Sequence, residues 1–149
     1  MSLPTGILDG QDKVTISMDI KSNSEGNFFT FALGTDFNKY FFFKVAKDSV
    51  RFAITQNTWS GESDAEYKVT GTEWHKYTFV IDNYTIKTYV DGELLGTTET
   101  TTKISDLGDD LMLWIGKSFY LEDDYFTGSI DNLQIYTSAL SDTDVKGLK

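Results

Sequence analysis

The alternation of apolar and polar residues over several short stretches is the feature that most restricts how this chain can fold. Val14, Ile16 and Met18 alternate with polar residues, and the same period of two recurs at residues 50–54 and 86–90. Successive side chains of a β-strand point to opposite faces of the sheet, so this pattern predicts strands with one buried face. No segment before residue 138 has a convincing helical repeat. We therefore predict an all-β fold.

Turn signals separate the predicted strands. Asp82-Asn83, Asp91-Gly92 and Gly108-Asp109 lie between apolar runs, which favours antiparallel hairpins. The predicted strands are residues 13–20, 28–34, 39–46, 49–55, 66–70, 74–82, 84–91, 94–99, 111–117 and 128–136. About ten strands in one domain predict two packed antiparallel sheets.

The end of the chain shows the signals of a short C-terminal helix. Ser141 is a suitable N-cap, Asp144 stands three residues later as the acidic member of a capping box, and Gly147 can end the helix. We expect this helix to seal an edge of the sandwich.

Composition and charge restrict the partners and the chemistry. A chain of 149 residues is long enough for one domain with its own core. Its net charge is −10 with scattered Lys and Arg residues, so we expect no nucleic-acid partner. The absence of cysteine excludes disulfides, thiolate metal sites and cysteine nucleophiles. The N-terminus lacks the features of a signal peptide and no long apolar run occurs, so we expect neither a signal peptide nor a membrane span in this chain.

Several stretches together resemble a known family. They are Leu3–Leu8, Trp74–Asp82, Ile86–Glu93 and Trp114–Asp142, and the last contains Gly-Lys-Ser, Gly-x-Ile-Asp, Ile-Tyr and Ala-Leu-Ser in succession. In this order and spacing they resemble the laminin G-like, concanavalin A-like jelly-roll domains of bacterial carbohydrate-active enzymes. The resemblance implies a two-sheet antiparallel jelly-roll β-sandwich over residues 1–149.

The resemblance also implies a function. Domains of this variety are appended to glycoside hydrolases, often of family 43, that act on plant arabinan or xylan. The implied role is a non-catalytic carbohydrate-binding or accessory module, secreted or at the cell surface, with the catalytic domain of the same polypeptide as a partner. The opening strand and acidic loop of the family are missing, and Asp124 stands where a proline is common. We therefore expect the chain to be a piece of a longer multidomain glycosidase.

No residue is assigned a catalytic role. Glucanases of this architecture place paired carboxylates on one strand face, as in Glu-x-Asp-x-x-Glu, and no predicted strand here carries that pattern. The carboxylates fall in turns and loops, and the spacing suggests no catalytic partner for His75. The domain itself is expected not to be an enzyme.

Aromatic residues in loops are the best candidates for ligand contact, because sugar rings bind flat apolar surfaces combined with a few polar groups. Trp59 lies in a polar loop, and Tyr120 and Tyr125 flank an acidic loop that contains Asp123. We predict these four residues as ligand-binding. The run Tyr40–Phe43 must place aromatic rings on both faces of its strand, and its outer face is either a platform or covered by strand-end packing or by the C-terminal helix.

Calcium is the one cofactor that the resemblance suggests. Asp131 matches the aspartate of Gly-x-Ile-Asp, which in relatives supports a metal ion together with groups of the opening loop. Asp131 is therefore the candidate ligand of a structural calcium ion. Trp74 and Trp114 are expected to be scaffold residues.

Two functions remain open from the sequence. One is a module that binds arabinan- or xylan-type plant glycans and keeps a linked glycosidase near its substrate. The alternative is a purely structural accessory domain that packs on the catalytic domain and binds no glycan. Aromatic residues on a sheet face serve either role, so the sequence does not separate them.

Overall fold

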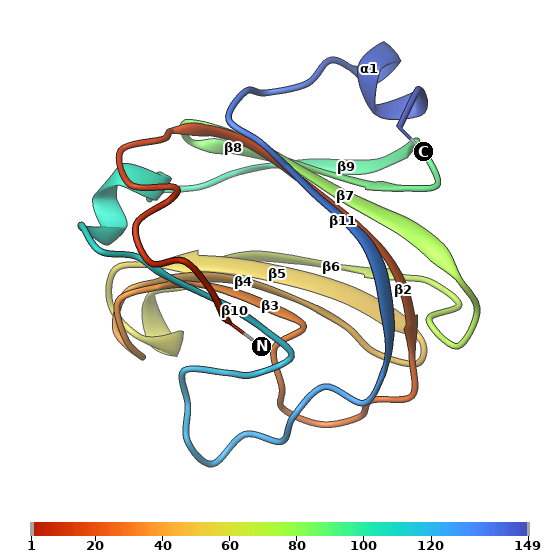
Figure 1. Ribbon diagram of the computed structural model, residues 1–149, viewed down its shortest axis with the longest axis horizontal. Helices are drawn as coiled ribbons and strands as arrows, with labels where there is room; N and C mark the ends of the chain where they lie inside the picture. The colour runs from red at the N-terminus through yellow and green to blue at the C-terminus, as the bar shows by residue number, and fades with distance from the viewer. Residues whose placement is uncertain (1, 149) are drawn as a thin grey trace.

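The computed structural model describes residues 2–148 and shows two antiparallel sheets packed face to face, with one short helix outside them (Figure 1). Sheet A has the strand order β1-β10-β3-β4-β5-β6, and sheet B has the order β11-β2-β7-β8-β9. Neighbouring strands in each sheet are distant in sequence at several points, which is typical of a sandwich whose chain crosses between layers. The predicted all-β, two-sheet fold is confirmed.

The strands of sheet A are β1 (Ser2–Leu3), β3 (Phe31–Gly34), β4 (Tyr40–Val45), β5 (Ser49–Thr55), β6 (Ser63–Lys68) and β10 (Met112–Ile115). The strands of sheet B are β2 (Lys13–Ser22), β7 (His75–Asp82), β8 (Thr85–Val90), β9 (Glu93–Glu99) and β11 (Gly128–Tyr136). Short 3₁₀ turns occupy Trp59–Gly61 and Ile104–Leu107.

Every second side chain of the strands points between the sheets, and these side chains form the core. In β4, Phe41 and Phe43 point inward and are fully buried, and the ring of Phe43 stacks on Phe79 of β7 with centroids 4.3 Å apart. In β2, Ile16 and Met18 fill the same layer. Each such side chain contributes about 1.5–3 kcal/mol by leaving water, so the register of both sheets is strongly fixed.

Some predicted strands differ from those observed. β3 begins at Phe31 instead of residue 28, because the ring of Phe29 lies over the outer face of sheet A, stacked 3.9 Å from Phe42. β6 spans Ser63–Lys68 instead of residues 66–70, because the chain leaves the ladder after Lys68. The two-residue strand β1, which pairs with β10, was not predicted.

The helix α1 (Asp142–Lys146) forms where its capping signals predicted it. The hydroxyl of Ser141 accepts a hydrogen bond from the backbone N–H of Asp144 at 3.2 Å, and Gly147 is the C-cap. Within residues 2–148 no helix is long and apolar enough to span a membrane.

The position of α1 differs from the expectation that it seals an edge. Val145 is buried against Val80 of β7 and Tyr89 of β8, which are inner strands of sheet B. The helix therefore covers part of the outer face of sheet B (Figure 1). The cause is that Val80 and Tyr89 point away from the core and present an apolar surface there.

Candidate functional site

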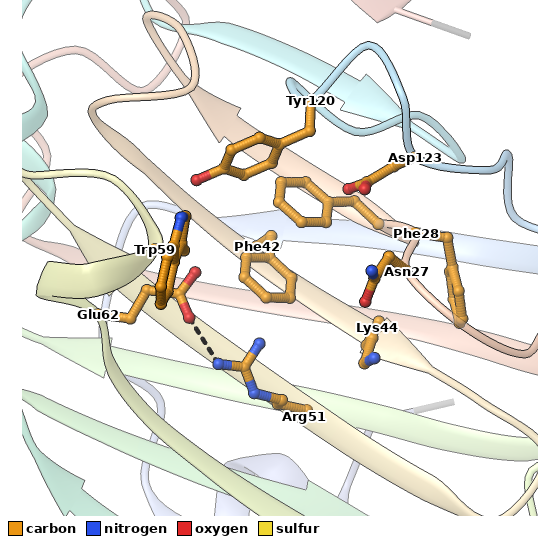
Figure 2. A pocket seen from close by; sticks show the side chains of 10 residues that line it. Asn27, Phe28, Phe42, Lys44, Arg51, Trp59, Glu62, Tyr120 and Asp123 are labelled. Carbon is orange, nitrogen blue, oxygen red and sulfur yellow. Dashed lines mark hydrogen bonds and ion pairs between the residues drawn. The ribbon is translucent and has the colours of Figure 1, made fainter.

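A cavity of about 420 Å³ opens on the outer face of sheet A (Figure 2). Trp59 and Phe28 stand on opposite sides of Phe42, with Tyr120 and Arg51 on the other two sides. We call it the polar cavity, and its lining residues are Asn27, Phe28, Phe29, Phe42, Lys44, Arg51, Trp59, Glu62, Tyr120 and Asp123. The structure thus brings together Trp59, Tyr120 and Asp123 of the predicted ligand-binding residues.

The floor of the polar cavity comes from β4 and β5. Because Phe41 and Phe43 face the core, Phe42 and Lys44 point outward. Arg51 lies directly opposite Lys44 in the β4–β5 ladder and points outward as well. The guanidinium carbon of Arg51 lies 5.2 Å from the centroid of the Phe42 ring, a cation–π distance. The alternation of side chains along these strands therefore places the Phe42 ring beneath the guanidinium of Arg51.

Two carboxylates hold Arg51 in position. Its Nη2 donates to Glu62 Oε1 at 2.6 Å, and its Nε donates to Asp64 Oδ2 at 3.1 Å. The side chain of Glu62 is only 10% exposed, and that of Arg51 is 23% exposed. Charge-assisted hydrogen bonds of this kind fix the direction of the guanidinium plane. Arg51 therefore presents a preorganised donor surface to the cavity.

A chain of tyrosine hydroxyls continues the network from Glu62. The hydroxyl of Tyr40 donates to Glu62 Oε2 at 2.5 Å, since a carboxylate can only accept. The hydroxyl of Tyr120 lies 2.8 Å from that of Tyr40 and donates to it, with Phe37 O at 3.3 Å as a second acceptor. Glu62 is thus occupied on both oxygens, and Tyr120 is tied to sheet A.

Burial and this network shift several pKa values. Burial, with the hydrogen bonds to Glu62 and Tyr120, raises the pKa of Tyr40 far above its usual range. Burial, followed by the charge of Arg51, lowers the pKa of Lys44. For Arg51, burial alone would lower the pKa, but the hydrogen bond and charge of Glu62, together with Asp64, raise it overall. Tyr40 therefore stays a hydrogen-bond donor and Arg51 a cation at physiological pH.

Trp59 projects from a short loop that is fixed by its own hydrogen bonds. The indole is 71% exposed, although the loop around it is anchored. The backbone N–H of Thr58 donates to Asn38 O at 3.0 Å, and the hydroxyl of Thr55 donates to Thr58 O at 2.8 Å. Trp59 thus lies in the polar loop where the sequence places it, and its exposed indole stands beside the cavity (Figure 2).

Asp123 and Tyr120 reach the cavity from one loop between β10 and β11. The buried hydroxyl of Ser118 donates to Asp123 Oδ2 at 2.7 Å and accepts from the backbone N–H of Tyr120 at 3.0 Å. The backbone N–H of Asp124 donates to Asn27 O at 3.0 Å, which ties this loop to the segment before β3. Ser118 therefore orients both predicted residues at once.

The outer face of the run Tyr40–Phe43 is largely covered. Tyr40 and Phe42 are 0% and 2% exposed, because the rings of Phe29 and Phe119 pack over them. The cover comes from the segments before β3 and after β10, and α1 has no part in it. Of this run, only Phe42 lines the polar cavity, so the open platform is not present and the alternative of a covered face is confirmed.

A second cavity of about 470 Å³ adjoins the first. We call it the apolar cavity, and its lining residues are Phe37, Thr58, Trp59, Phe119, Tyr120, Leu121, Glu122 and Asp123. It shares Trp59, Tyr120 and Asp123 with the polar cavity. The two cavities are therefore neighbours along the same surface.

Tyr125 and Asp131 lie apart from these cavities. Tyr125 is 69% exposed and lines none of the described cavities, so its contact with a ligand stays a prediction.

Asp131 lies on β11, opposite Asp19 of β2, in sheet B. The Nζ of Lys76 lies 2.9 Å from Asp19 Oδ1. No group of three or more acidic or histidine side chains suited to a metal ion occurs among residues 2–148, and calcium binding by Asp131 stays a prediction.

Asp131 lines a different cavity, of about 380 Å³, with Trp74 and His75. Trp74 was expected to be scaffold, but it is 50% exposed and forms a wall of this cavity. His75 Nδ1 lies 2.6 Å from Asp91 Oδ2, a partner that the spacing did not suggest. The hairpin of β7 and β8 brings Asp91 there, because the turn that follows β8 lies beside the start of β7.

Sequence reasoning missed Arg51, Glu62 and Lys44. A signal for Arg51 was present, since it is the only arginine in the chain and stands between Val50 and Phe52, whose period predicts that they face the core. An arginine on the outer face of an aromatic-rich strand is a candidate for recognition of polar groups. No such signal marks Glu62, which reaches Arg51 only through the pairing of β5 with β6.

Comparisons with known proteins place this fold. The Concanavalin A-like lectin/glucanases superfamily, in its laminin G form, matches residues 1–146. An alpha-L-arabinofuranosidase of Bifidobacterium longum is 30% identical over 148 residues, which cover 88% of this chain and 14% of that protein, so the chain spans a small part of its relative.

Solved structures agree with this placement. Domain 4 of AbnA, a GH43 extracellular arabinanase from Geobacillus stearothermophilus solved with arabinotriose, has a TM-score of 0.79 at 21% identity, covering 98% of this chain and 70% of that one. The CBM40 of a Ruminococcus gnavus IT-sialidase, bound to alpha2,3 sialyllactose, has a TM-score of 0.78 at 19% identity, covering 99% and 94%. The chain belongs to the concanavalin A-like lectin and glucanase superfamily, as a laminin G-like jelly-roll domain.

Proposed function

We propose that this chain is a non-catalytic carbohydrate-binding module of a polysaccharide-degrading glycoside hydrolase, and that it binds arabinan- or xylan-type glycan in the polar cavity. One observation carries the proposal. Arg51 is held by Glu62 in a fixed direction next to the exposed ring of Trp59. An apolar ring beside preorganised polar groups is the combination that sugar rings require.

The chemistry of the cavity suits hydroxyl groups. The ring of Trp59 offers a flat face to the C–H side of a sugar, and Arg51 supplies donors to the hydroxyl oxygens. The carboxylate of Asp123 accepts from hydroxyls and is already oriented by Ser118. Because Arg51 and Asp123 are held by their partners before the ligand arrives, binding costs less ordering entropy.

The charge of the cavity favours a neutral glycan. Arg51 is neutralised by Glu62, and Asp123 adds a negative charge opposite Lys44. An anionic sugar would therefore find no surplus of positive charge. The similar proteins named above include one solved with arabinotriose and one named as an arabinofuranosidase, which supports a neutral arabino-oligosaccharide as the ligand.

The geometry argues against catalysis at this position. Glycoside hydrolysis needs one carboxyl group free to attack or to accept a proton and another able to donate a proton. Both oxygens of Glu62 are engaged, by Arg51 and by Tyr40, and Asp64 accepts from the same guanidinium. These carboxylates act as supports of Arg51, which is a binding role.

The proposed role includes the context of the chain. The parent polypeptide is a glycoside hydrolase, secreted or at the cell surface, whose catalytic domain acts on the same glycan. The module raises the local concentration of that glycan around the catalytic domain. The similarity to part of an arabinofuranosidase supports this arrangement.

The alternative function is a structural accessory domain that packs on the catalytic domain. Exposed apolar side chains favour it, since Phe37, Trp59 and Leu121 are 50%, 71% and 91% exposed around one cavity. A cluster of this kind also suits a domain interface.

Isothermal titration of the isolated chain distinguishes the two functions. The panel consists of arabinan, arabinoxylan, xylan and arabinotriose, with sialyllactose as the anionic comparison. The proposal expects saturable binding of at least one neutral glycan and weaker binding of sialyllactose. A flat response to every neutral glycan would remove the binding function and leave the structural one.

A further inference from the structure

The apolar cavity is continuous with the proposed glycan site. Trp59, Tyr120 and Asp123 line both cavities, so a ligand in the polar cavity has the apolar cavity directly beside it. Tyr120 is fixed in this shared wall, because its hydroxyl lies 2.8 Å from that of Tyr40 and its backbone N–H donates to Ser118. Tyr120 is therefore held in place within the shared wall, and a ligand that passes along this wall meets both cavities.

The lining of the apolar cavity differs in chemistry from that of the polar cavity. Rings and one leucine dominate it: Phe37 is 50% exposed, Leu121 is 91% exposed, and Phe119 forms the deeper part at 7%. Among residues 2–148 no cation lines it, and its charged groups are the carboxylates of Glu122 and Asp123. This lining is suited to a flat neutral group and repels an anion.

We infer that the apolar cavity receives a neutral aryl group attached to the sugar that occupies the polar cavity, so that the ligand class is an aryl-substituted glycan. The inference rests on the proposed function and specifies its ligand. A further sugar ring fits the apolar cavity less well, because its hydroxyls would need more polar partners than Thr58 and the carboxylates of Glu122 and Asp123 provide. An aryl ring has no hydroxyl to satisfy and gains from ring contacts with Phe37 and Trp59.

The test compares two glycosides of one arabino-oligosaccharide, the methyl glycoside and the 4-nitrophenyl glycoside, by isothermal titration. The measured quantity is the ratio of their dissociation constants in the unmodified chain and in Leu121→Ser and Phe37→Ser. Both side chains are at least half exposed, so neither substitution disturbs the core. Leu94→Ser, at a 45% exposed leucine on β9 of sheet B, is the matched control.

The inference expects the 4-nitrophenyl glycoside to bind about fivefold more tightly than the methyl glycoside in the unmodified chain. The ratio should fall to about one in Leu121→Ser and Phe37→Ser and remain about fivefold in Leu94→Ser. Equal affinities in the unmodified chain would overturn the inference and leave the proposed function standing. So would a ratio that the two substitutions do not change.

Two other results would also decide the matter. In one, an added sugar ring raises the affinity, Leu121→Ser removes that gain, and the aryl group raises the affinity not at all. This result would assign the apolar cavity to the glycan chain and overturn the inference. Absence of binding by both glycosides and by the glycans of the panel above would overturn the inference and the proposed function together.

Discussion

Arg51 Nη2 lies 2.6 Å from Glu62 Oε1, and this ion pair stands on the outer face of sheet A at the edge of a cavity. The two residues come from β5 and from the turn before β6, so the pairing of these strands brings them together. The ion pair points outward beside the exposed Trp59 (Figure 2), where the proposed glycan site requires it.

Replacing Arg51 with lysine should weaken glycan binding by about tenfold, about 1.4 kcal/mol, while the fold remains. Lysine keeps the charge but cannot reach Glu62 and Asp64 with one planar fork, so the direction of the donors is lost. Titration with the best glycan of the panel measures the effect, and circular dichroism checks the fold. An affinity equal to that of the unmodified chain would show that Arg51 does not contact the ligand.

Gly71→Ala should destabilise the domain by at least about 2 kcal/mol. A Cβ atom at this position would lie 1.8 Å from the backbone oxygen of Ala46, and backbone atoms cannot move aside as a flexible side chain does. Gly71 also donates its backbone N–H to Lys47 O at 2.8 Å, which fixes its position. Urea unfolding measures the change in free energy. For comparison, Gly10→Ala has open space around the new Cβ but a positive φ of 71°, and should cost less.

Acid should remove a contribution of Asp12 to stability. Burial alone would raise the pKa of Asp12, but hydrogen bonds from Ser105 and the charge of Lys103 outweigh it and lower the pKa below the usual 3.8. A carboxyl group whose folded pKa is lowered stabilises the fold above its unfolded pKa, and this stabilisation is lost as the pH falls through the folded value.

The measurement is urea unfolding of the unmodified chain and of Asp12→Asn at pH 6 and pH 3. The difference in stability between the two proteins should be larger at pH 6 than at pH 3, because only the ionised carboxylate gains from Ser105 and Lys103. A difference that stays constant between these pH values would contradict the assigned pKa shift.

The predicted calcium site has its own test. If Asp131 binds a calcium ion, added calcium should raise the melting temperature, and Asp131→Asn should abolish that rise. Asp106→Asn is a suitable control, because it also removes one carboxylate but does so away from the cavity that Asp131 lines. Asp106 lies on the 3₁₀ turn after β9, where its carboxylate accepts from the backbone N–H of Lys103 at 3.1 Å. A melting temperature that calcium leaves unchanged would remove the prediction.

Local patterns predicted the fold because its strands and helix depend on short stretches of sequence. The period of two at Val50, Phe52 and Ile54 was sufficient for β5, since each of these residues faces the core. The capping residues Ser141 and Gly147 were sufficient for α1. The covering of sheet B by α1 was not predicted, because it depends on Val80 and Tyr89, which are more than fifty residues away.

The site was predicted only in part for a similar reason. Trp59 and Asp123 were found because each lies in a stretch of mostly polar or acidic residues between strands, and such loops run over the surface. The contact of Tyr120 with Tyr40 joins residues 80 positions apart, and no local pattern encodes it. The partner of Arg51 likewise depends on which strands are neighbours, so a site built across strands needs the topology as well as the sequence.

The most direct test of the central claim is isothermal titration of arabinotriose or arabinan into Trp59→Ala and Trp74→Ala. Both tryptophans are at least half exposed, but Trp59 stands at the polar cavity and Trp74 at a cavity of sheet B. The account predicts that Trp59→Ala lowers the affinity by about tenfold or more, while Trp74→Ala binds like the unmodified chain. Undiminished binding in Trp59→Ala, or loss of binding in Trp74→Ala instead, would contradict it.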